Sequence, residues 1–338
     1  MPAHETRVVV IGESLVDIIS DPRQPESVQA HPGGSPLNVA VGAARLGLPT
    51  SLVTHYADDR HGLLIGEHLL SNSVHVINGG TAPTSTAHAT LGPDGAADYT
   101  FAITWEMGGA ALPALAAVEG SAHVHTGSIA AVLPPGEKAT LALVQAARRH
   151  ATVSYDPNCR PGISPDAAVA RRQAELFVAA SDVVKASDED LRWLYPDRTP
   201  EETLKAWLAL GPAVVAVTRG AAGPVILSRN GRVEMVAEPI TVEDTVGAGD
   251  SFMAGLISGL AQLGALGAEG GRALLTSMTP EELEALAAYA NRAAAITCSR
   301  QGANPPRKDE LGPLTRASTA GDPGRNVSGG TADAANGH

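Results

Sequence analysis

The sequence predicts an α/β fold, in which a parallel central sheet has helices on both faces and a small antiparallel lid is attached. Short apolar, β-branched runs alternate with segments of helical pattern, which is typical of a parallel sheet covered on both sides. Segments 14–21 and 85–103 instead alternate polar and apolar residues, the second around Gly-Pro-Asp-Gly. That pattern predicts a hairpin. The hairpin is either a flap over a ligand site or a plain sheet edge.

The predicted elements follow in order along the chain. Residues 7–12, RVVVIG, form a buried strand, and residues 35–47 form a helix with Ser35 at the N-cap, Pro36 in the first turn and Gly47 at its end. Further strands are predicted at 51–54, 122–127, 152–157, 182–187, 213–218 and 224–228. Further helices are predicted at 61–70, 137–150, 166–180, 201–210, 250–264 and 280–297.

The chain is expected to form one α/β domain followed by a tail. The domain covers residues 1–313, and segments around 14–30 and 85–105 supply the lid. The tail, 314–338, consists mainly of small and polar residues that cannot bury a core, so it is predicted to be disordered.

Composition limits the classes of partner. The 338 residues carry a formal net charge of −12, and an acidic surface repels nucleic-acid phosphate and anionic lipid, so neither partner is expected. No apolar run is long enough to span a membrane. The first residues lack the pattern of a signal peptide, and two cysteines, Cys159 and Cys298, fit a reducing compartment. The expected location is the cytoplasm.

The stretch 243–264, EDTVGAGDSFMAGLISGLAQLG, joins a glycine corner to a helix that is apolar nearly all round and therefore buried. The first amides of a helix lack intrahelical acceptors and carry positive partial charge, and Gly247 and Gly249 allow a sharp turn. These features predict a small anion pocket made of backbone. Asp250 is either a helix cap or a general base beside that pocket, as phosphoryl transfer requires. Neither GxxxxGK[ST] nor GxGxxG occurs in the chain.

Two motifs resemble those of a known family. DTVGAGD, at 244–250, resembles the C-terminal signature of the ribokinase-like, PfkB-type carbohydrate kinases, and GGSPLNVAVGAARLG, at 33–47, resembles their N-terminal signature. The likeness runs from about residue 7 to residue 306. Within the family, bacterial fructokinases are most similar, through the stretches GESLVD, HTGSIAAVLPPG, SYDPNCRPGI, VKASDEDLRWLYP and TCSRQGANPP.

The resemblance implies a catalytic site and a sugar site. Asp250 matches the family's catalytic base, and Gly247, Ala248 and Gly249 match its anion hole. The implied sugar-binding residues are Asp17, Gly33, Gly34 and Asn38. The alternative for Asn38 is an ordinary position on the surface of its helix.

Two further sugar-site candidates come from their chemistry and position. Arg160, in DPNCRP, offers a planar fork of donors to a sugar or a phosphate. Trp105 follows the predicted lid and is expected to line the sugar pocket.

The resemblance also implies a nucleotide site. VTRGAAG, at 217–223, matches the loop that lies along ATP. The implied ATP contacts are Ser187, Thr218, Gly220, Gly223, Gly249, Asn291 and Gly302.

Two carboxylates are candidates for metal binding. The family's Asn-x-x-Glu element, which organises Mg²⁺ through water, corresponds to residues 187–190, so Asp190 is the magnesium candidate. A helix cap at Ser187 is the alternative. Asp244 matches an acid that helps to hold a monovalent cation such as K⁺, although Pro306 stands where some relatives place a serine for that ion.

The expected function is ATP-dependent phosphorylation of fructose to fructose 6-phosphate, with ATP and Mg²⁺ as cofactors. The alternative enzymes are 2-keto-3-deoxygluconate kinase and ribokinase, and the non-enzyme alternative is a catalytically silent, sugar-binding regulator. The lid is expected to exclude water from the sugar and to join two chains as a homodimer, as in many relatives.

Overall fold

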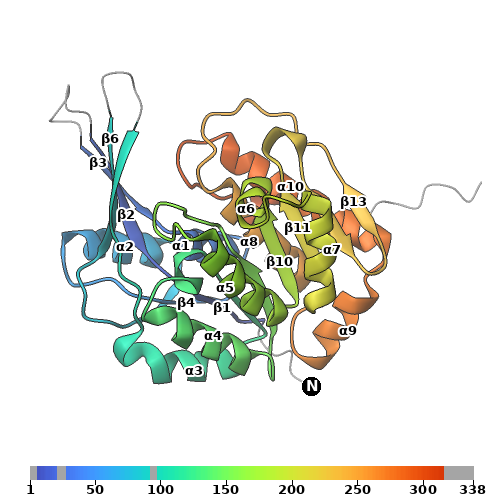
Figure 1. Ribbon diagram of the computed structural model, residues 1–338, viewed down its shortest axis with the longest axis horizontal. Coiled ribbons are helices and arrows are strands. Elements are labelled where there is room, and N and C mark those ends of the chain that lie inside the picture. The colour runs from blue at the N-terminus through green and yellow to red at the C-terminus, as the bar shows by residue number, and fades with distance from the viewer. Residues whose placement is uncertain (1–5, 21–27, 92–96, 316–338) are drawn as a thin grey trace, which may run out of the picture.

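A nine-stranded sheet forms the centre of the protein (Figure 1). The computed structural model describes residues 6–20, 28–91 and 97–315, and the strand order is β13-β12-β11-β10-β9-β8-β1-β4-β5. The strands are β1 (Val8–Ile11), β4 (Thr50–Thr54), β5 (His75–Asn78), β8 (His123–Gly127), β9 (Thr152–Asp156), β10 (Val183–Ser187), β11 (Val214–Thr218), β12 (Val225–Ser228) and β13 (Arg232–Glu234). Every pair from β5 to β11 is parallel, which confirms the predicted central sheet.

The last two strands of this sheet run in alternating directions. β12 pairs antiparallel with β11, and β13 pairs antiparallel with β12. The connection from β11 to β12 contains only the short helix η3 (Gly220–Ala222). A parallel strand would need a long crossover, so this short connection requires an antiparallel one.

Helices form a layer on each face of the sheet (Figure 1). One layer contains α3 (Ala111–Glu119), α4 (Gly136–Ala147), α5 (Ala167–Ala179), α6 (Asp188–Leu194) and α7 (Pro200–Leu210). The other contains α1 (Ser35–Arg45), α2 (Arg60–Ser71), α8 (Ala248–Gln262), α9 (Glu269–Ser277) and α10 (Pro280–Cys298). Shorter helices are η1 (Gly108–Ala110), η2 (Ser128–Ala131) and α11 (Lys308–Leu311). Because successive side chains of a strand face opposite ways, Val9 and Ile11 enter one core cluster, and Val8 and Val10 enter the other.

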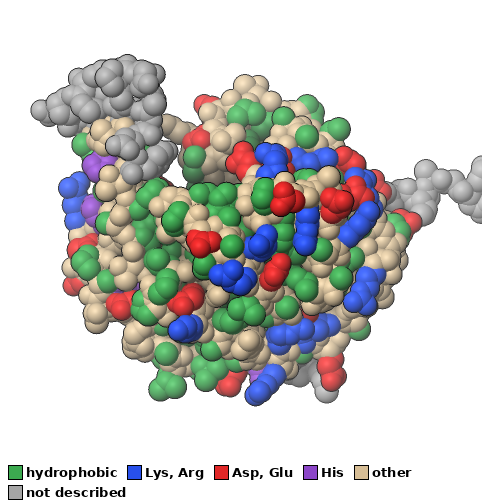
Figure 2. Space-filling view, in the orientation of Figure 1, with side chains coloured by type: hydrophobic (Ala, Val, Ile, Leu, Met, Phe, Trp, Pro, Cys, Tyr) green, Lys and Arg blue, Asp and Glu red, His purple; other side chains and the backbone are tan. Residues whose placement is uncertain are grey.

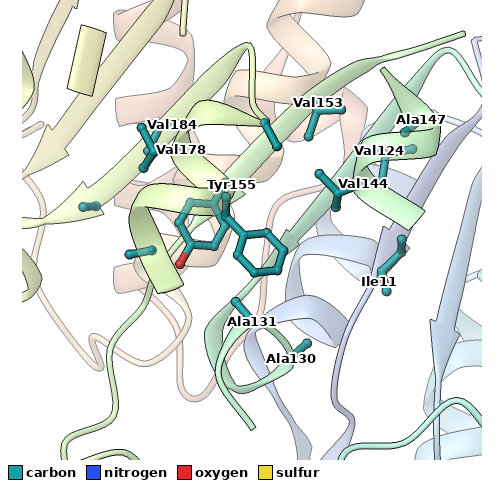
Figure 3. Close-up of a cluster of buried hydrophobic side chains, with 14 of the residues drawn as sticks. Ile11, Val124, Ala130, Ala131, Val144, Ala147, Val153, Tyr155, Val178 and Val184 are labelled. Atoms are coloured by element: carbon teal, nitrogen blue, oxygen red, sulfur yellow. The ribbon is translucent and has the colours of Figure 1, made fainter. Parts of the chain in front are cut away.

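The core consists mainly of aliphatic side chains, because aromatic residues make up only 3% of the chain. Figure 3 shows the first cluster around Tyr155, where valines and an isoleucine of the sheet meet small residues of the helices. Tyr155 itself stacks on Phe177, with the ring centroids 5.2 Å apart. Stacked rings add specific geometry to a core that otherwise depends on the close packing of aliphatic groups.

A second sheet extends from the main body (Figure 1). Its strands are β2 (Leu15–Ser20), β3 (Gln29–Gly33), β6 (Ser85–Leu91) and β7 (Ala97–Ala102), in the order β3-β2-β6-β7. The outer pairs are antiparallel as predicted, but the central pair β2–β6 is parallel. Both strands leave the body after the carboxyl end of a main-sheet strand, β1 for β2 and β5 for β6, so they run outward together. We call this sheet the lid.

An apolar cluster joins the base of the lid to the body. Leu15 and Ala87, from the two central lid strands, are buried with Ile129 of η2. The hairpin turn predicted at 92–95 lies outside the described residues, as does the predicted disordered tail from residue 316 onward.

The visible face of the molecule carries acidic and basic side chains side by side (Figure 2). None of the helices within the described residues is both long enough and apolar enough to cross a membrane.

Helix α8 packs between α1 and α10. It is buried along most of its length, as its apolar sequence predicts. A Cβ on Gly42 of α1 would lie 2.7 Å from the Cβ of Ala254, and a Cβ on Gly255 would lie 2.9 Å from the Cα of Ala290. Gly42 therefore allows α8 to approach α1 closely, and Gly255 allows it to approach α10 closely.

We predict that Gly255→Val lowers the free energy of unfolding by about 1–3 kcal/mol, because the added side chain overpacks the α8–α10 contact. Gly270→Val is the matched control: Gly270 also lies in a helix, α9, but a Cβ there would meet no neighbouring group within 4 Å, so its effect should stay within about 0.5 kcal/mol. Urea denaturation measures both. Equal effects would contradict this account of the helix packing.

Candidate active site

The candidate site lies where strand ends and two helix N-termini meet. Asp156, Ser187 and Thr218 end the neighbouring strands β9, β10 and β11. Ligands of open α/β sheets gather at this carboxyl edge. The N-termini of α1 and α8 supply the remaining groups, and these two helices pack against each other (Figure 1).

The predicted glycine corner forms the start of α8. Gly247 caps the helix with φ 74°, and a Cβ there would lie 2.7 Å from the Cβ of Ala303. The first bond of the helix runs from the Ser251 amide to the Gly247 carbonyl, at 2.9 Å. The amides of Gly249 and Asp250 precede this bond, and residues 247–249 are only half-buried. Free amides at a helix N-terminus are suited to bind an anion, and a ligand can approach these two.

Asp250 is held by two side chains of α1. Its Oδ1 accepts a hydrogen bond from Ser35 Oγ at 2.6 Å, and its Oδ2 accepts one from Asn38 Nδ2 at 2.8 Å. Asp250 is 8% exposed. The two donors are neutral, so they fix the orientation of the carboxylate without pairing its charge.

Ser35 does not cap α1, contrary to the prediction. Gly34, with φ 106°, takes the N-cap position, and no side chain caps the helix. The hydroxyl of Ser35 is directed to Asp250 instead. Asn38 is part-buried and bound to Asp250, so the alternative of an ordinary surface position for it is wrong.

On the lid side, Asp17 of β2 lies over Gly33 of β3. A Cβ on Gly33 would lie 2.2 Å from Asp17 Oδ2, so only glycine leaves room for this carboxylate. Burial raises the pKa of Asp17, against the opposing charges of Arg160 and His31. Gly34 is equally confined, because a Cβ there would lie 2.7 Å from the Glu13 carbonyl oxygen. Asp17, Gly33 and Gly34 therefore lie close together, and neither glycine position has room for a Cβ.

The two other sugar-site candidates have different surroundings. Arg160 is exposed, and its Nη1 donates to the carbonyls of Asn158 and Cys159 at 3.3 and 3.0 Å. Trp105 is 0% exposed, and its Nε1 donates to Thr140 Oγ1 at 2.9 Å. The prediction that Trp105 lines an open sugar pocket is wrong, because this apolar ring packs within the core beneath the lid.

Ser187 and Asp190 form a capping box at the start of α6. Asp190 Oδ2 accepts from the amide and the hydroxyl of Ser187, at 2.8 and 2.7 Å, and Oδ1 accepts from the Cys159 amide at 2.7 Å. A carboxylate offers about four acceptor positions, so Asp190 retains room for one water. Its arrangement fits both the capping alternative and a water-mediated magnesium contact, and it ties the loop that carries Arg160 to α6.

The predicted ATP loop follows β11. Gly220 and Gly223 have positive φ values, 52° and 75°, and a Cβ on Gly223 would lie 2.1 Å from the Met235 carbonyl oxygen. Arg219 pins the loop: its Nε and Nη2 donate to the carbonyls of Gly223 and Ala222 at 2.9 and 3.0 Å. Thr218 is half-buried and Gly220 is exposed at the start of this turn.

The remaining nucleotide-site candidates connect separate segments. Asn291 of α10 is 8% exposed and donates from Nδ2 to the Val236 carbonyl at 2.9 Å, so it is not solvent-facing. Asp244 accepts from the amides of Val246 and Gly302, at 3.0 and 2.8 Å. These hydrogen bonds, the one from Val246 first, lower the pKa of Asp244 despite partial burial. Asp244 therefore ties the glycine corner to the segment around Gly302. Within the described residues, no group of three or more His, Cys, Asp or Glu side chains could hold a metal ion.

Sequence reasoning missed an ion pair under the glycine corner. Lys185 Nζ lies 2.7 Å from Asp156 Oδ2, and both side chains are almost wholly buried. The available signal was one lysine inside the apolar strand DVVKAS. A charged residue inside a buried strand requires a partner, and the parallel register places Asp156 beside it.

Glu13 is a second buried group that the sequence reasoning did not assign. It is 2% exposed, and its Oε2 accepts from the Ala130 amide at 3.1 Å. Burial raises the pKa of the Glu13 carboxyl from 4.5 to about 7, against the effect of hydrogen bonds from its own amide, Ser128 and Ala130. Between about pH 4.5 and pH 7 the folded protein keeps a proton that the unfolded chain has lost. The contribution of Glu13 to stability therefore falls as pH rises through this window.

We predict that Glu13→Gln removes this titration. The unfolding free energy of the variant minus that of the wild type should therefore increase by about 3 kcal/mol from pH 4 to pH 8. Denaturant titrations of both proteins across that range measure the difference. A difference that does not change with pH would show that Glu13 ionises normally in the folded state.

Comparisons with known proteins agree with this geometry. A family model described as pfkB family carbohydrate kinase matches residues 5–310. The chain is 31% identical over 262 residues to the fructokinase of Rhizobium leguminosarum bv. trifolii, which covers 75% of this chain and 79% of that protein. The structure of a fructokinase with bound ATP from Xylella fastidiosa has a TM-score of 0.80 at 24% identity, over 91% of this chain and 97% of that one. A fructokinase double mutant from Vibrio cholerae O395, with fructose, ADP and potassium ion bound, has a TM-score of 0.70 at 25% identity, over 89% of this chain and 94% of that one. The chain belongs to the pfkB family of carbohydrate kinases, as its two signatures predicted.

Proposed function

We propose that this sugar kinase phosphorylates fructose to fructose 6-phosphate with ATP. The observation that carries the proposal is the carboxylate of Asp250, oriented by Ser35 and Asn38 beside the free amides of the glycine corner. A base and a set of anion donors at one point meet the requirements of phosphoryl transfer to an alcohol. The curated relative from Rhizobium leguminosarum bv. trifolii is named fructokinase, which favours fructose as the acceptor.

The roles of the chain's groups follow from their positions. Asp250 takes the proton of the sugar hydroxyl as its oxygen attacks the γ-phosphorus of ATP. The bond from that phosphorus to the β–γ bridging oxygen breaks, and ADP leaves with the bond electrons. Negative charge on the phosphoryl oxygens must be stabilised. The corner formed by Gly247, Ala248 and Gly249 does this through the amides of Gly249 and Asp250, because the Ala248 amide already donates to the Thr245 carbonyl at 3.2 Å. Asp17 accepts hydroxyl protons of the sugar, beside Gly33 and Gly34.

The nucleotide and its ions are proposed to bind across the ends of β10 and β11. Thr218, Gly220 and Gly223 line the phosphates, whereas Asn291 and Gly302 flank the base. Asp190 would hold one of the waters of an Mg²⁺ ion bound with ATP, and that ion would supply positive charge to the phosphate oxygens. The potassium ion in the Vibrio cholerae structure favours a monovalent ion beside Asp244.

The lid is proposed to close over the sugar and to keep water from the base. Ile19 and Phe101, on lid strands, are 38% and 39% exposed. We also propose that two copies of the chain pair through the lid as a homodimer. The free cysteines Cys159 and Cys298 are consistent with our proposal of a cytoplasmic enzyme.

A panel of sugars tested with Mg-ATP decides the acceptor. Fructose should give the highest kcat/KM, measured by release of ADP, with ribose and 2-keto-3-deoxygluconate as the competing acceptors. Faster turnover of either competitor would replace fructose while leaving the kinase assignment intact. Sugar binding without any turnover would instead favour the silent regulator.

We predict that Asp250→Asn lowers kcat by about 10²–10⁴, the usual loss for a general base, while sugar binding is retained. Asp166→Asn is the matched control, because Asp166 also lies at a helix N-terminus, that of α5, where it accepts hydrogen bonds from the amides of Ala168 and Val169. It should leave kcat unchanged. Near-normal turnover by Asp250→Asn would reject Asp250 as the base.

We predict that Asp17→Ala raises the sugar KM by about 10–100-fold, the effect of losing a hydrogen bond to a charged group. The ATP KM should change little, because Asp17 lies on the lid side of the site. Steady-state kinetics with each substrate varied in turn measures both constants. A change confined to the ATP KM would contradict the placement of Asp17 at the sugar.

A further inference from the structure

Lys185 is a buried cation that lies between Asp156 and the glycine corner. It lies in β10, among apolar neighbours, and is 3% exposed. Removing an ammonium group from water is costly unless its hydrogen bonds and charge are matched. β9 and β10 run parallel with Val183 beside Ser154 and Val184 beside Tyr155. This register brings Lys185 alongside Asp156, where the 2.7 Å ion pair forms.

The ammonium of Lys185 also contacts the glycine corner. Nζ donates to the Gly249 carbonyl at 3.3 Å, and a Cβ on Gly249 would lie 3.0 Å from Nζ. The carbonyl of Gly249 and the amide of Asp250 belong to one planar peptide unit, in which they point in opposite directions. Holding the oxygen at one end therefore fixes the direction of the Asp250 N–H at the other. A cation at the oxygen also polarises that N–H as a donor.

Several charges act on this lysine from different elements. Burial lowers its pKa, but Asp156 of β9, Asp250 of α8 and Asp190 of α6 together hold the pKa of Lys185 above its ordinary value. His125 of β8 also faces this group: burial, then His123 and Lys185, hold the pKa of His125 well below its usual range. The lysine is therefore charged and the histidine neutral. One ammonium group interacts electrostatically with three carboxylates.

We propose that Lys185 is a positioning residue of phosphoryl transfer, which orients and polarises the peptide between Gly249 and Asp250 so that its N–H faces the transferring phosphoryl group. Asp156, on the neighbouring strand β9, holds the ammonium in place through the 2.7 Å ion pair. The inference rests on the proposed anion hole and extends it to a residue that has no contact of its own with the phosphoryl group.

The competing explanation is that the ion pair only stabilises the fold. Removing one partner of a buried pair leaves an unpaired charge and destabilises a protein strongly, whereas replacing both partners is often nearly neutral. Loss of activity in Lys185→Met alone would therefore be ambiguous. Lys185→Met/Asp156→Asn removes both charges, so it separates loss of the ammonium from loss of stability.

The test compares kcat, both KM values and unfolding free energy in the full-length protein. Lys185→Met should lower kcat by about 10–100-fold, somewhat less than loss of a direct oxyanion donor, with each KM within about threefold of the wild type. In the double variant, stability should recover while kcat stays low. Recovery of kcat together with stability would overturn the proposal.

Arg272→Met supplies the matched control at the other end of the same strand. Arg272 Nε lies 2.8 Å from Oδ1 of Asp182, a residue that is 6% exposed and directly precedes β10. Its loss should lower stability without lowering kcat. All variants are assayed with the sugar that the wild type turns over fastest, so a wrong acceptor assignment does not affect this test.

A binding measurement completes the test. ADP with aluminium fluoride mimics the transferring phosphoryl group, and calorimetry gives its affinity. Lys185→Met should bind this probe more weakly by about the factor lost in kcat, while binding of ADP alone is unchanged. Unchanged affinity for the fluoride complex would overturn the proposal.

Discussion

The site depends on one constraint: a carboxylate must sit at the start of a buried helix without being neutralised there. Asp250 meets it through two hydrogen bonds from α1, one from Ser35 and one from Asn38. A lysine or arginine in their place would satisfy the charge but would weaken the carboxylate as a base. These two neutral donors orient the carboxylate and form no ion pair with it. Gly42 of α1 matters for the same reason, because it lets α1 pack closely on Ala254 of α8, the helix that carries Asp250.

The acidic residues around Asp250 make different contacts. Asp190 accepts two hydrogen bonds from Ser187 and one from Cys159 in the loop that carries Arg160. Asp244 joins the glycine corner to the segment around Gly302. Asp156 is paired with Lys185, yet burial and its acidic neighbours still raise the pKa of Asp156 to about 6. One buried lysine thus offsets the charge of a cluster of carboxylates beside the proposed phosphate-binding corner.

Local pattern was sufficient to predict the framework of this protein. The alternation of strands and helices predicted the parallel sheet, and the two signatures identified the glycine corner and the family. Local pattern could not give pairing direction: the lid's central strands come from different parts of the chain, and their parallel pairing follows from where each leaves the body. Likewise, strand patterning marked 224–228 without showing that β12 reverses.

The errors at the site have a common cause, which is contact between residues far apart in the sequence. Ser35 has the composition of a helix cap, but its partner is Asp250, 215 residues away. Trp105 follows the lid in sequence, yet its indole reaches Thr140 inside the core. Lys185 was visible as a charge in an apolar strand, but its partners come from other elements. The pairing of β9 with β10 brings it to Asp156, and the packing of α8 brings it to the Gly249 carbonyl.

The most direct test of the central claim is a crystal structure of the protein with ADP, aluminium fluoride and its preferred sugar. An Asp250 carboxylate oxygen should lie about 2.6–3.2 Å from the acceptor hydroxyl, the reach of a general base. The fluoride group should be in contact with the amides at the start of α8. A fluoride group bound away from those amides, or an acceptor hydroxyl facing a residue other than Asp250, would contradict the account.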